Sequence, residues 1–370
     1  MRRDLADVFC TVEEGIKGKK AKEWNLVDEV VKNSTFDETV LERAKEFAEK
    51  STRPSDLTGI ELTPLNRTIA DDGSLTYSAV EVAIDRTLNM ATITISGPDK
   101  DAPSSTDALQ AEGADTWMLR VVRELDDAIL HLRINELEIG LLAFKTQGNP
   151  EAVKAHEAYL IANKEHWLAN EILNYWKRLL KRIDVTSRSL VAMIENGSCF
   201  VGVLAELAFA CDRSYMMEGD FDGDNRPVAT LTLTESNFGM MPMGNDISRL
   251  EARFYGMPEM VDGAREELGN SLEAFDANEL GLVTFAFDDI DWDDEVRLFL
   301  EERSSYSPDG LTAMEANLRF VGPETMESRI FGRLTAWQNW VFQRPNAVGE
   351  EGALQKYGSG TRAKFDMNRV

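Results

Sequence analysis

One stretch of the sequence, Met193–Leu250, constrains the fold of this chain more than any other part. The apolar run Ser189–Ile194 leads into it and predicts a buried strand that ends at the Asn196-Gly197 turn. A helix rich in Ala and Leu is expected to open near Gly202, and a second short strand then leads into a second turn. Loops between strands and helices often carry ligand groups in α/β folds, because helix N-termini present free backbone N–H donors. The stretch therefore predicts an α/β fold with a candidate site at these turns.

Two carboxylates within this stretch are candidates for acid/base chemistry. Glu206 lies inside the expected helix with apolar neighbours on both sides, and Glu235 lies between a Thr-rich strand and a Gly-containing turn. Apolar surroundings raise the pKa of a carboxyl group, which suits a general acid or base. Alternatively, each glutamate caps a helix or bridges two nearby groups, and spacing alone favours this structural interpretation.

The order of these residues resembles the crotonase (enoyl-CoA hydratase/isomerase) superfamily, whose motif NG…GGG.ELALACD is followed by PE..LG..PG.GG..RL. The matching positions are Asn196, Gly197, Gly202, Glu206–Asp212, Glu235, Gly239, Pro242, Arg249 and Leu250. The first loop is one residue longer here, and Val201 and Val203 stand where the family has glycines. Met243–Asp246 replaces the second glycine-rich turn. The resemblance implies an α/β fold with a crotonase-like spiral core of ββα units and C-terminal helices.

The resemblance also implies an oxyanion hole, in which two backbone N–H groups bind a thioester oxygen. The apolar run Leu137–Phe144 predicts a buried strand, and crotonases place one of these N–H groups in the turn after the corresponding strand. Thr146 or Gln147 would supply the first N–H, and Val201 or Gly202 the second. Losing one such donor typically costs ~3 kcal/mol of transition-state stabilisation. Without the resemblance, the same turn is simply a surface turn before a helix, and both interpretations stay open.

A phrase near the N-terminus recurs late in the chain, where AKEWNLV at residues 21–27 matches ANELGLV at residues 277–283. Crotonases carry this phrase just before their C-terminal helices, so the resemblance implies the end of one copy followed by a second copy. We expect residues 1–50 to be the helical tail of a truncated first crotonase unit. Residues 51–74 are expected to form a linker, and residues 75–370 a second crotonase-like domain with a C-terminal helical region.

Hydrophobic periodicity predicts most of the remaining elements. They are two or three N-terminal helices with a short strand at 26–31, a hairpin of strands at 80–85 and 91–96, a polar loop at 98–113, an amphipathic helix at 117–133 and a long helical stretch at 151–182. The C-terminal part carries the aromatic residues Phe320, Phe331, Trp337, Trp340 and Phe342. The resemblance implies that they pack over a core or a neighbouring subunit, in a homodimer or higher homo-oligomer.

The charge and residue counts exclude several classes of protein. A formal net charge of −25 over 370 residues argues against nucleic acid and anionic membrane surfaces as partners. Three cysteines without metal spacing and three histidines without a ligand pair argue against disulfides and a metal site. No apolar run approaches ~18 residues, the length that spans a bilayer. A cytoplasmic protein is therefore expected.

Further phrases narrow the resemblance to one branch of the superfamily. Arg2–Cys10, Glu14–Asp28 and Asn196–Phe200 are similar to the ring-opening lyases of aerobic benzoate degradation. This resemblance implies that the ring of 2,3-epoxybenzoyl-CoA is opened hydrolytically and that one ring carbon leaves as formate. The acyl-CoA substrate brings its own coenzyme A, and no metal or redox cofactor is implied. The resemblance places the family's catalytic carboxylates in the first crotonase unit, of which this chain is expected to hold only the tail.

Two other functions stay open. One is an enoyl-CoA hydratase or isomerase in which one of Glu206 and Glu235 activates water and the other protonates the leaving oxygen. The other is a non-catalytic structural half that completes a dimer, which the departures at Val201 and Asn245-Asp246 favour.

Overall fold

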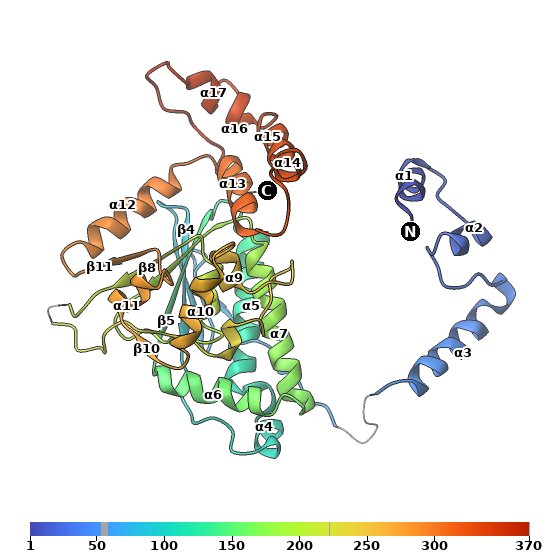
Figure 1. The fold of residues 1–370 in the computed structure, drawn as a ribbon, viewed down its shortest axis with the longest axis horizontal. Helices are drawn as coiled ribbons and strands as arrows, with labels where there is room; N and C mark the ends of the chain where they lie inside the picture. The colour runs from blue at the N-terminus through green and yellow to red at the C-terminus, as the bar shows by residue number, and fades with distance from the viewer. Residues whose placement is uncertain (53–57, 222, 370) are drawn as a thin grey trace. The chain divides into compact units, whose positions relative to one another are not determined.

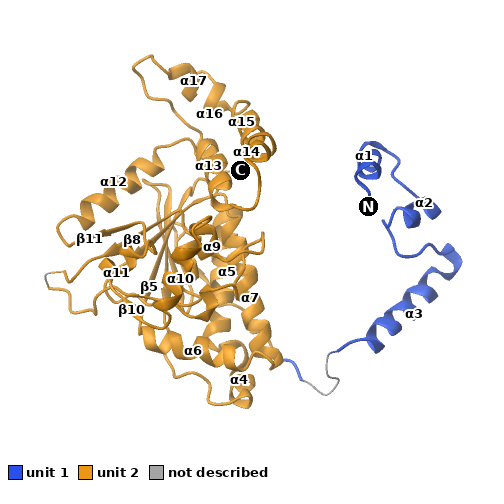
Figure 2. Ribbon diagram, viewed as in Figure 1, with its two compact units in different colours: residues 1–59 blue, residues 60–370 orange. Residues whose placement is uncertain are grey.

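The computed structural model describes residues 1–52, 58–221 and 223–369. The chain forms two compact units, residues 1–59 and 60–370, which Figure 2 distinguishes by colour. The expected boundaries at residues 50 and 74 stay predictions, and part of the expected linker, residues 53–57, lies outside the described residues.

The first unit is helical, as expected. Its helices are α1 (Arg3–Thr11), α2 (Gly18–Glu23) and α3 (Phe36–Glu49), with a 3₁₀ turn at Asn33–Thr35. The strand expected at residues 26–31 was wrong, since the structure assigns no strand there. Instead, Asn25 has a positive φ of 56°, and the Leu26 N–H donates to the Ala21 carbonyl. This pattern closes the C-terminus of α2, and no strand among the described residues pairs with the apolar residues that follow.

The second unit is organised around an eight-stranded mixed sheet (Figure 1). Its order is β1 (Thr68–Ile69), β2 (Leu75–Thr76), β3 (Val80–Asp85), β4 (Met90–Ser96), β5 (Leu141–Gln147), β6 (Ser189–Ile194), β8 (Arg213–Met217) and β11 (Phe285–Phe287). The strands from β1 to β4 pair antiparallel, and those from β4 to β11 pair parallel. A second sheet has the order β10 (Ser271–Leu272), β9 (Leu231–Thr232) and β7 (Phe200–Val201).

The strands agree closely with the hydrophobic pattern. The expected strand Ser189–Ile194 is β6 with the same bounds, and all six of its residues are buried, as a central parallel strand requires. The expected hairpin is β3 and β4. The strand β5 begins four residues later than expected, because Leu137 is exposed and the Ile139 N–H closes a turn onto the Glu136 carbonyl.

Helices flank the main sheet, and Figure 1 shows α5 and α7 side by side. The helices up to β11 are α4 (Thr106–Glu112), α5 (Trp117–Asn135), α6 (Pro150–Ala162), α7 (Trp167–Asp184), α8 (Ala205–Ala210), α9 (Arg249–Arg253), α10 (Pro258–Glu266) and α11 (Ala274–Glu279). The polar loop expected at 98–113 instead contains α4, which the Ser105 hydroxyl caps by accepting from the Ala108 N–H. The single helical stretch expected at 151–182 is two helices, because Asn163 ends α6 with its side chain on the Tyr159 carbonyl.

The C-terminal part is helical, as expected. It comprises α12 (Trp292–Ser304), α13 (Pro308–Arg319), α14 (Met326–Arg329), a π-helical turn (Ile330–Leu334), α15 (Thr335–Val341), α16 (Pro345–Val348) and α17 (Ala353–Lys356). Phe331 is 74% exposed, so this aromatic side chain does not belong to the core of the unit. None of the described helices is both long enough and apolar enough to pass through a lipid bilayer.

Candidate functional site

The helix α8 carries the first motif carboxylate into the protein core. Gly202 precedes this helix with a φ of 51°, a conformation that glycine adopts at little cost. Its N–H donates to the Thr232 carbonyl, and its own carbonyl accepts from the Glu206 N–H. The helix is only six residues long and is buried along its whole length. Glu206 therefore reaches a fixed position behind the turn at Gly202.

Glu206 is held by two partners from distant parts of the chain. One carboxylate oxygen accepts from Asn237 Nδ2 at 2.8 Å, and the other accepts from Arg249 at 2.8 Å. Arg249 also binds both oxygens of Asp184, at 3.0 and 2.6 Å, and all three charged side chains are almost fully buried. Burial raises the pKa of Glu206, and the positive charge of Arg249 opposes this shift. In this arrangement Glu206 bridges elements of the core, the structural alternative considered above.

Glu235, the second motif carboxylate, lies in a different environment. It opens a 3₁₀ turn, Glu235–Asn237, and its side chain is 61% exposed. The nearest cation is Arg265, at 3.7 Å. The structure links the two motif carboxylates only indirectly, because Asn237 from this turn donates to Glu206.

A third carboxylate, Glu157 of α6, lies beside the glycine turn and was not foreseen. One of its oxygens accepts from the Val203 N–H at 2.9 Å, and the other accepts from the Thr234 hydroxyl at 2.6 Å. No cation pairs with it among the described residues, and burial raises its pKa. A Cβ at Gly202 would lie 1.7 Å from the Glu157 carboxylate. The glycine is therefore required by the carboxylate packed against it.

A sequence signal for Glu157 did exist. Val153 and Leu160 lie four residues before it and three residues after it, on the buried face of α6. Periodicity alone therefore places Glu157 on the face of α6 that packs against the core.

The backbone groups proposed for an oxyanion hole are partly engaged within the protein. Thr146 and Gln147 end β5, and the Thr146 hydroxyl accepts from the Cys199 N–H, which joins this strand to the loop before Gly202. Val201 pairs with Thr232 in the second sheet, and the Gly202 N–H donates to the carbonyl of Thr232. The structure thus brings the two predicted halves together at the carboxyl ends of the strands. The assignment of the four residues to an oxyanion hole stays a prediction.

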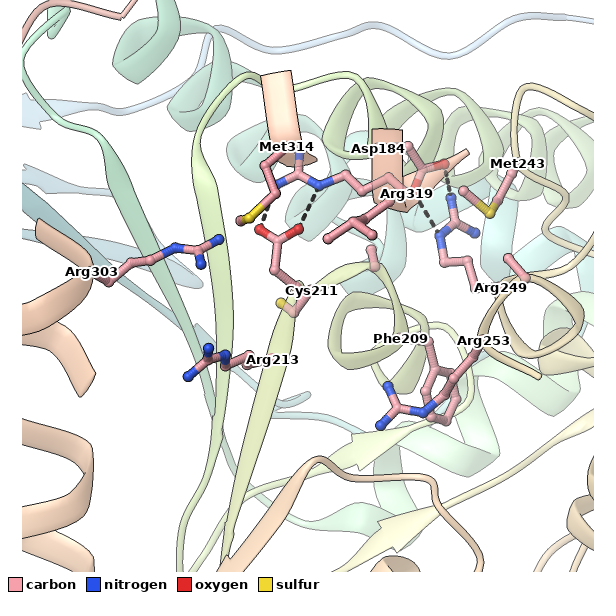
Figure 3. Close-up of a pocket in the computed structure, with 14 residues that line it drawn as sticks. Asp184, Phe209, Cys211, Arg213, Met243, Arg249, Arg253, Arg303, Met314 and Arg319 are labelled. Atoms are coloured by element: carbon pink, nitrogen blue, oxygen red, sulfur yellow. Dashed lines mark hydrogen bonds and ion pairs between the residues drawn. The ribbon is translucent and has the colours of Figure 1, made fainter. Parts of the chain in front are cut away.

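A pocket of about 310 Å³ lies at the opposite, amino ends of the parallel strands (Figure 3). Its walls come from the ends of α7 and α8, the start of β8, and α9, α12 and α13. Five arginines and two aspartates line it, namely Arg213, Arg249, Arg253, Arg303, Arg319, Asp184 and Asp212. Apolar side chains such as Phe209 and Met314 complete the lining.

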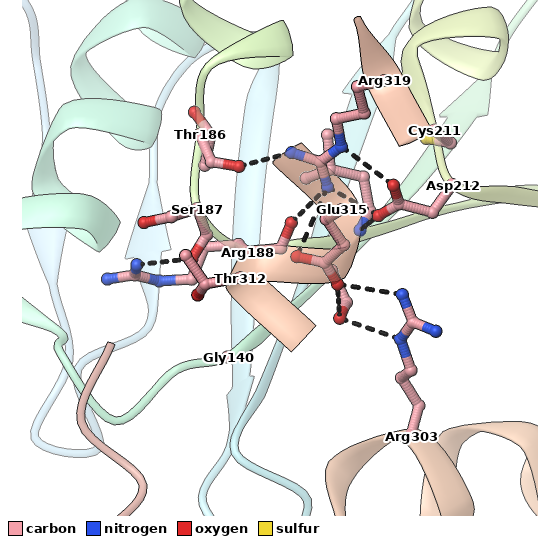
Figure 4. A network of polar contacts seen from close by, with 12 residues as sticks. Gly140, Thr186, Ser187, Arg188, Cys211, Asp212, Arg303, Thr312, Glu315 and Arg319 are labelled. Atoms are coloured by element: carbon pink, nitrogen blue, oxygen red, sulfur yellow. Dashed lines mark hydrogen bonds and ion pairs between the residues drawn. The ribbon is translucent and has the colours of Figure 1, made fainter. Parts of the chain in front are cut away.

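A buried polar network adjoins this pocket and centres on Glu315 of α13 (Figure 4). The Glu315 carboxylate lies 2.9 Å from Arg303, 3.5 Å from Arg369 and 3.8 Å from Arg319. Arg319 also binds both oxygens of Asp212, at 2.8 and 2.6 Å. This network therefore contains more arginines than carboxylates, although the chain as a whole has a net charge of −25.

Among residues 1–52, 58–221 and 223–369, no group of three or more His, Cys, Asp or Glu side chains could hold a metal ion.

Comparison with known proteins shows one similar lyase and several structures with a similar fold. No family model matches the sequence. The chain is 47% identical over all 370 residues to a benzoyl-CoA-dihydrodiol lyase from Aromatoleum evansii, and it spans 66% of that protein's length. Among solved structures, an enoyl-CoA hydratase from Geobacillus kaustophilus is similar with a TM-score of 0.56 and 15% identity, over 80% of this chain and 98% of the hydratase. An enoyl-CoA hydratase from Bacillus anthracis gives a TM-score of 0.55 and 14% identity, over 79% and 100%. These matches confirm the expected crotonase-like α/β fold.

Proposed function

Because this chain has a crotonase-like fold and resembles a curated lyase along its whole length, we propose that it is part of a CoA-thioester lyase of aerobic benzoate degradation. The proposed reaction is hydrolytic opening of the ring of 2,3-epoxybenzoyl-CoA, with one ring carbon released as formate and an aldehyde-bearing CoA thioester left. The observation that carries the proposal is the 47% identity to a benzoyl-CoA-dihydrodiol lyase along the whole chain. The structural neighbours support the fold alone.

Coenzyme A enters the proposed reaction as part of the acyl-CoA substrate. No metal or redox cofactor is proposed. The proposed assembly is a homodimer or higher homo-oligomer, since the apolar residue Phe331 in the C-terminal helices is exposed.

A specific observation favours a second candidate, in which this chain is a non-catalytic half of such an enzyme. Both oxygens of Glu206 are engaged, by Arg249 and Asn237. The Val203 N–H donates to Glu157, and the Gly202 N–H donates to Thr232. A general acid/base needs a free position toward its substrate, and an oxyanion hole needs free N–H donors. Two groups expected at the carboxyl-end site, the Glu206 carboxylate and the Gly202 N–H, are thus already engaged by the protein itself.

The experiment is an assay of the purified chain with 2,3-epoxybenzoyl-CoA, with formate measured as product, beside calorimetric titration with benzoyl-CoA. Formate release together with micromolar binding (~8 kcal/mol) supports the lyase proposal for this chain. Absence of both binding and turnover, with strong self-association, supports the non-catalytic half. Hydration of crotonyl-CoA that disappears in Glu235→Gln would contradict both and favour a hydratase or isomerase.

A further inference from the structure

Two arginines of the pocket at the amino ends of the strands make no ion pair with any described residue. They are Arg213, the first residue of β8, and Arg253, the last residue of α9. Arg213 lies over the ring of Phe299, 4.8 Å from its centroid. Arg253 donates from Nε to the Gly281 carbonyl at 2.6 Å. Figure 3 shows both guanidinium groups without a carboxylate partner among the residues drawn.

The other three arginines of this pocket are paired. Arg249 binds Asp184, Arg319 binds Asp212, and Arg303 binds Glu315 behind the pocket wall. Both aspartates in the lining, Asp184 and Asp212, are therefore already paired with an arginine. Neither of them can also balance the charge of Arg213 or Arg253, so the pocket keeps a positive excess.

This excess is unusual for its surroundings. The chain as a whole carries a net charge of −25, with 65 acidic and 40 basic residues, so acidic side chains outnumber the basic ones that they could pair with. Burial lowers the pKa of Arg253, which means that its charged form loses hydration without gaining an anionic partner. A charge held in this way is costly unless a ligand of opposite sign completes the arrangement.

We propose that the pocket lined by Arg213 and Arg253 binds a small phosphate-type anion. Guanidinium groups match phosphate oxygens with paired hydrogen bonds, and arginine is preferred over lysine for this task. A volume of about 310 Å³ lies at the lower end of the range for ligand pockets and suits a phosphate ester or pyrophosphate. The site lies at the amino ends of the strands, away from the motif residues at the carboxyl ends, and so goes beyond the proposed function.

Phosphate groups of this kind have two sources, free phosphate anions and the phosphates of coenzyme A. The test is calorimetric titration of the full chain with pyrophosphate, repeated in the presence of saturating coenzyme A. Saturable binding at one site per chain is expected. If coenzyme A abolishes it, the phosphates of coenzyme A are the occupant, and if coenzyme A has no effect, a free anion is. No saturable binding of either probe overturns the proposal.

The variants Arg213→Gln and Arg253→Gln locate the site. Each is expected to weaken pyrophosphate binding by about tenfold, the loss of one charge-assisted contact. The matched control is Arg297→Gln on α12, whose guanidinium is half exposed and pairs with Asp294 and Glu301. Equal weakening in the control, or unchanged binding in both pocket variants, overturns the proposal. Should one pocket variant fail to fold, as judged by its melting temperature, the other still decides.

Discussion

The two ends of the short helix α8 make an instructive comparison. Glu206 near its start and Asp212 just after its end both belong to one sequence motif, and each binds an arginine. Around Glu206, the single cation Arg249 serves both Glu206 and Asp184, and the neighbouring Glu157 has only neutral donors. Beyond Asp212 the balance is reversed, and arginines outnumber carboxylates.

The two ends of α8 therefore differ in whether the protein itself supplies partners for the charged groups. At the Glu206 end, the protein supplies its own partners for the carboxylates and for the N–H groups of the glycine turn. At the Asp212 end, a pocket of about 310 Å³ is lined by Arg213 and Arg253, which have no carboxylate partner among the described residues. Since a partly buried arginine without a carboxylate partner is costly, its presence at the Asp212 end indicates where an anion would bind.

The strongest way to break this comparison is to remove the cation at the Glu206 end. Arg249→Met leaves Glu206 and Asp184 buried without a counter-charge, and we expect a loss of about 3–5 kcal/mol in the free energy of unfolding. Urea denaturation measures it. Arg297→Met, at an exposed ion pair, is the control and should cost less than about 1 kcal/mol. Similar losses in the two variants would show that Arg249 is not central to this cluster.

Removing the central carboxylate tests the other end. Glu315→Gln keeps the shape of the side chain but leaves Arg303, Arg319 and Arg369 with less negative charge, so we expect a loss of about 2–4 kcal/mol. Pyrophosphate should bind more tightly to this variant, because the pocket becomes more positive. Glu324→Gln, at a more exposed pair with Arg333, is the control. Weaker anion binding in Glu315→Gln would contradict the charge balance described here.

The buried carboxyl of Glu157 predicts a dependence on pH. Because burial raises its pKa in the folded state, the folded protein holds a proton that the unfolded chain loses above about pH 4.3. Stability from this group is therefore present at lower pH and falls as pH rises toward the folded pKa, by at most about 1.4 kcal/mol per pH unit.

Glu157→Gln mimics the protonated acid, since its amide can accept from the Val203 N–H and donate to the Thr234 hydroxyl. We expect this variant to lose that pH dependence and to gain stability over the wild type as pH rises, as denaturation midpoints at a series of pH values will show. Parallel pH profiles for the two proteins would contradict a buried carboxyl with a raised pKa. Glu235→Gln serves as the exposed comparison.

The smallest effect is expected for Glu235 itself. Its side chain is 61% exposed and lies 3.7 Å from Arg265, so Glu235→Gln should change the free energy of unfolding by less than about 0.5 kcal/mol. Thermal unfolding checks this. A loss above about 2 kcal/mol would indicate that Glu235 has a buried partner.

The features that could be predicted best from the sequence are those set by residues close together along the chain, such as the bounds of strands and helices. The bounds of β6 followed from a continuous apolar run, and the helix expected to open near Gly202 is α8, which carries Glu206. The polar composition of residues 98–113 predicts a loop and hides α4, whose N-terminus Ser105 caps.

The pairings that define the two ends of α8 could not be predicted in the same way. Asp184 binds Arg249 across 65 residues, and Asp212 binds Arg319 across 107 residues. Such pairs are set by the packing of distant elements, which local periodicity does not determine. The same holds for Glu157, whose burial was readable from α6 but whose contact with the Val203 N–H was not.

The most direct test of the contrast between the two ends is a crystal of this chain soaked in tungstate, a heavy analogue of phosphate, with anomalous scattering recorded. The opposite charge balance predicts a strong anomalous peak in the pocket beside Arg213 and Arg253, and none beside Glu206 and Glu157. A peak at the Glu206 end, or an empty pocket at saturating tungstate, would contradict it.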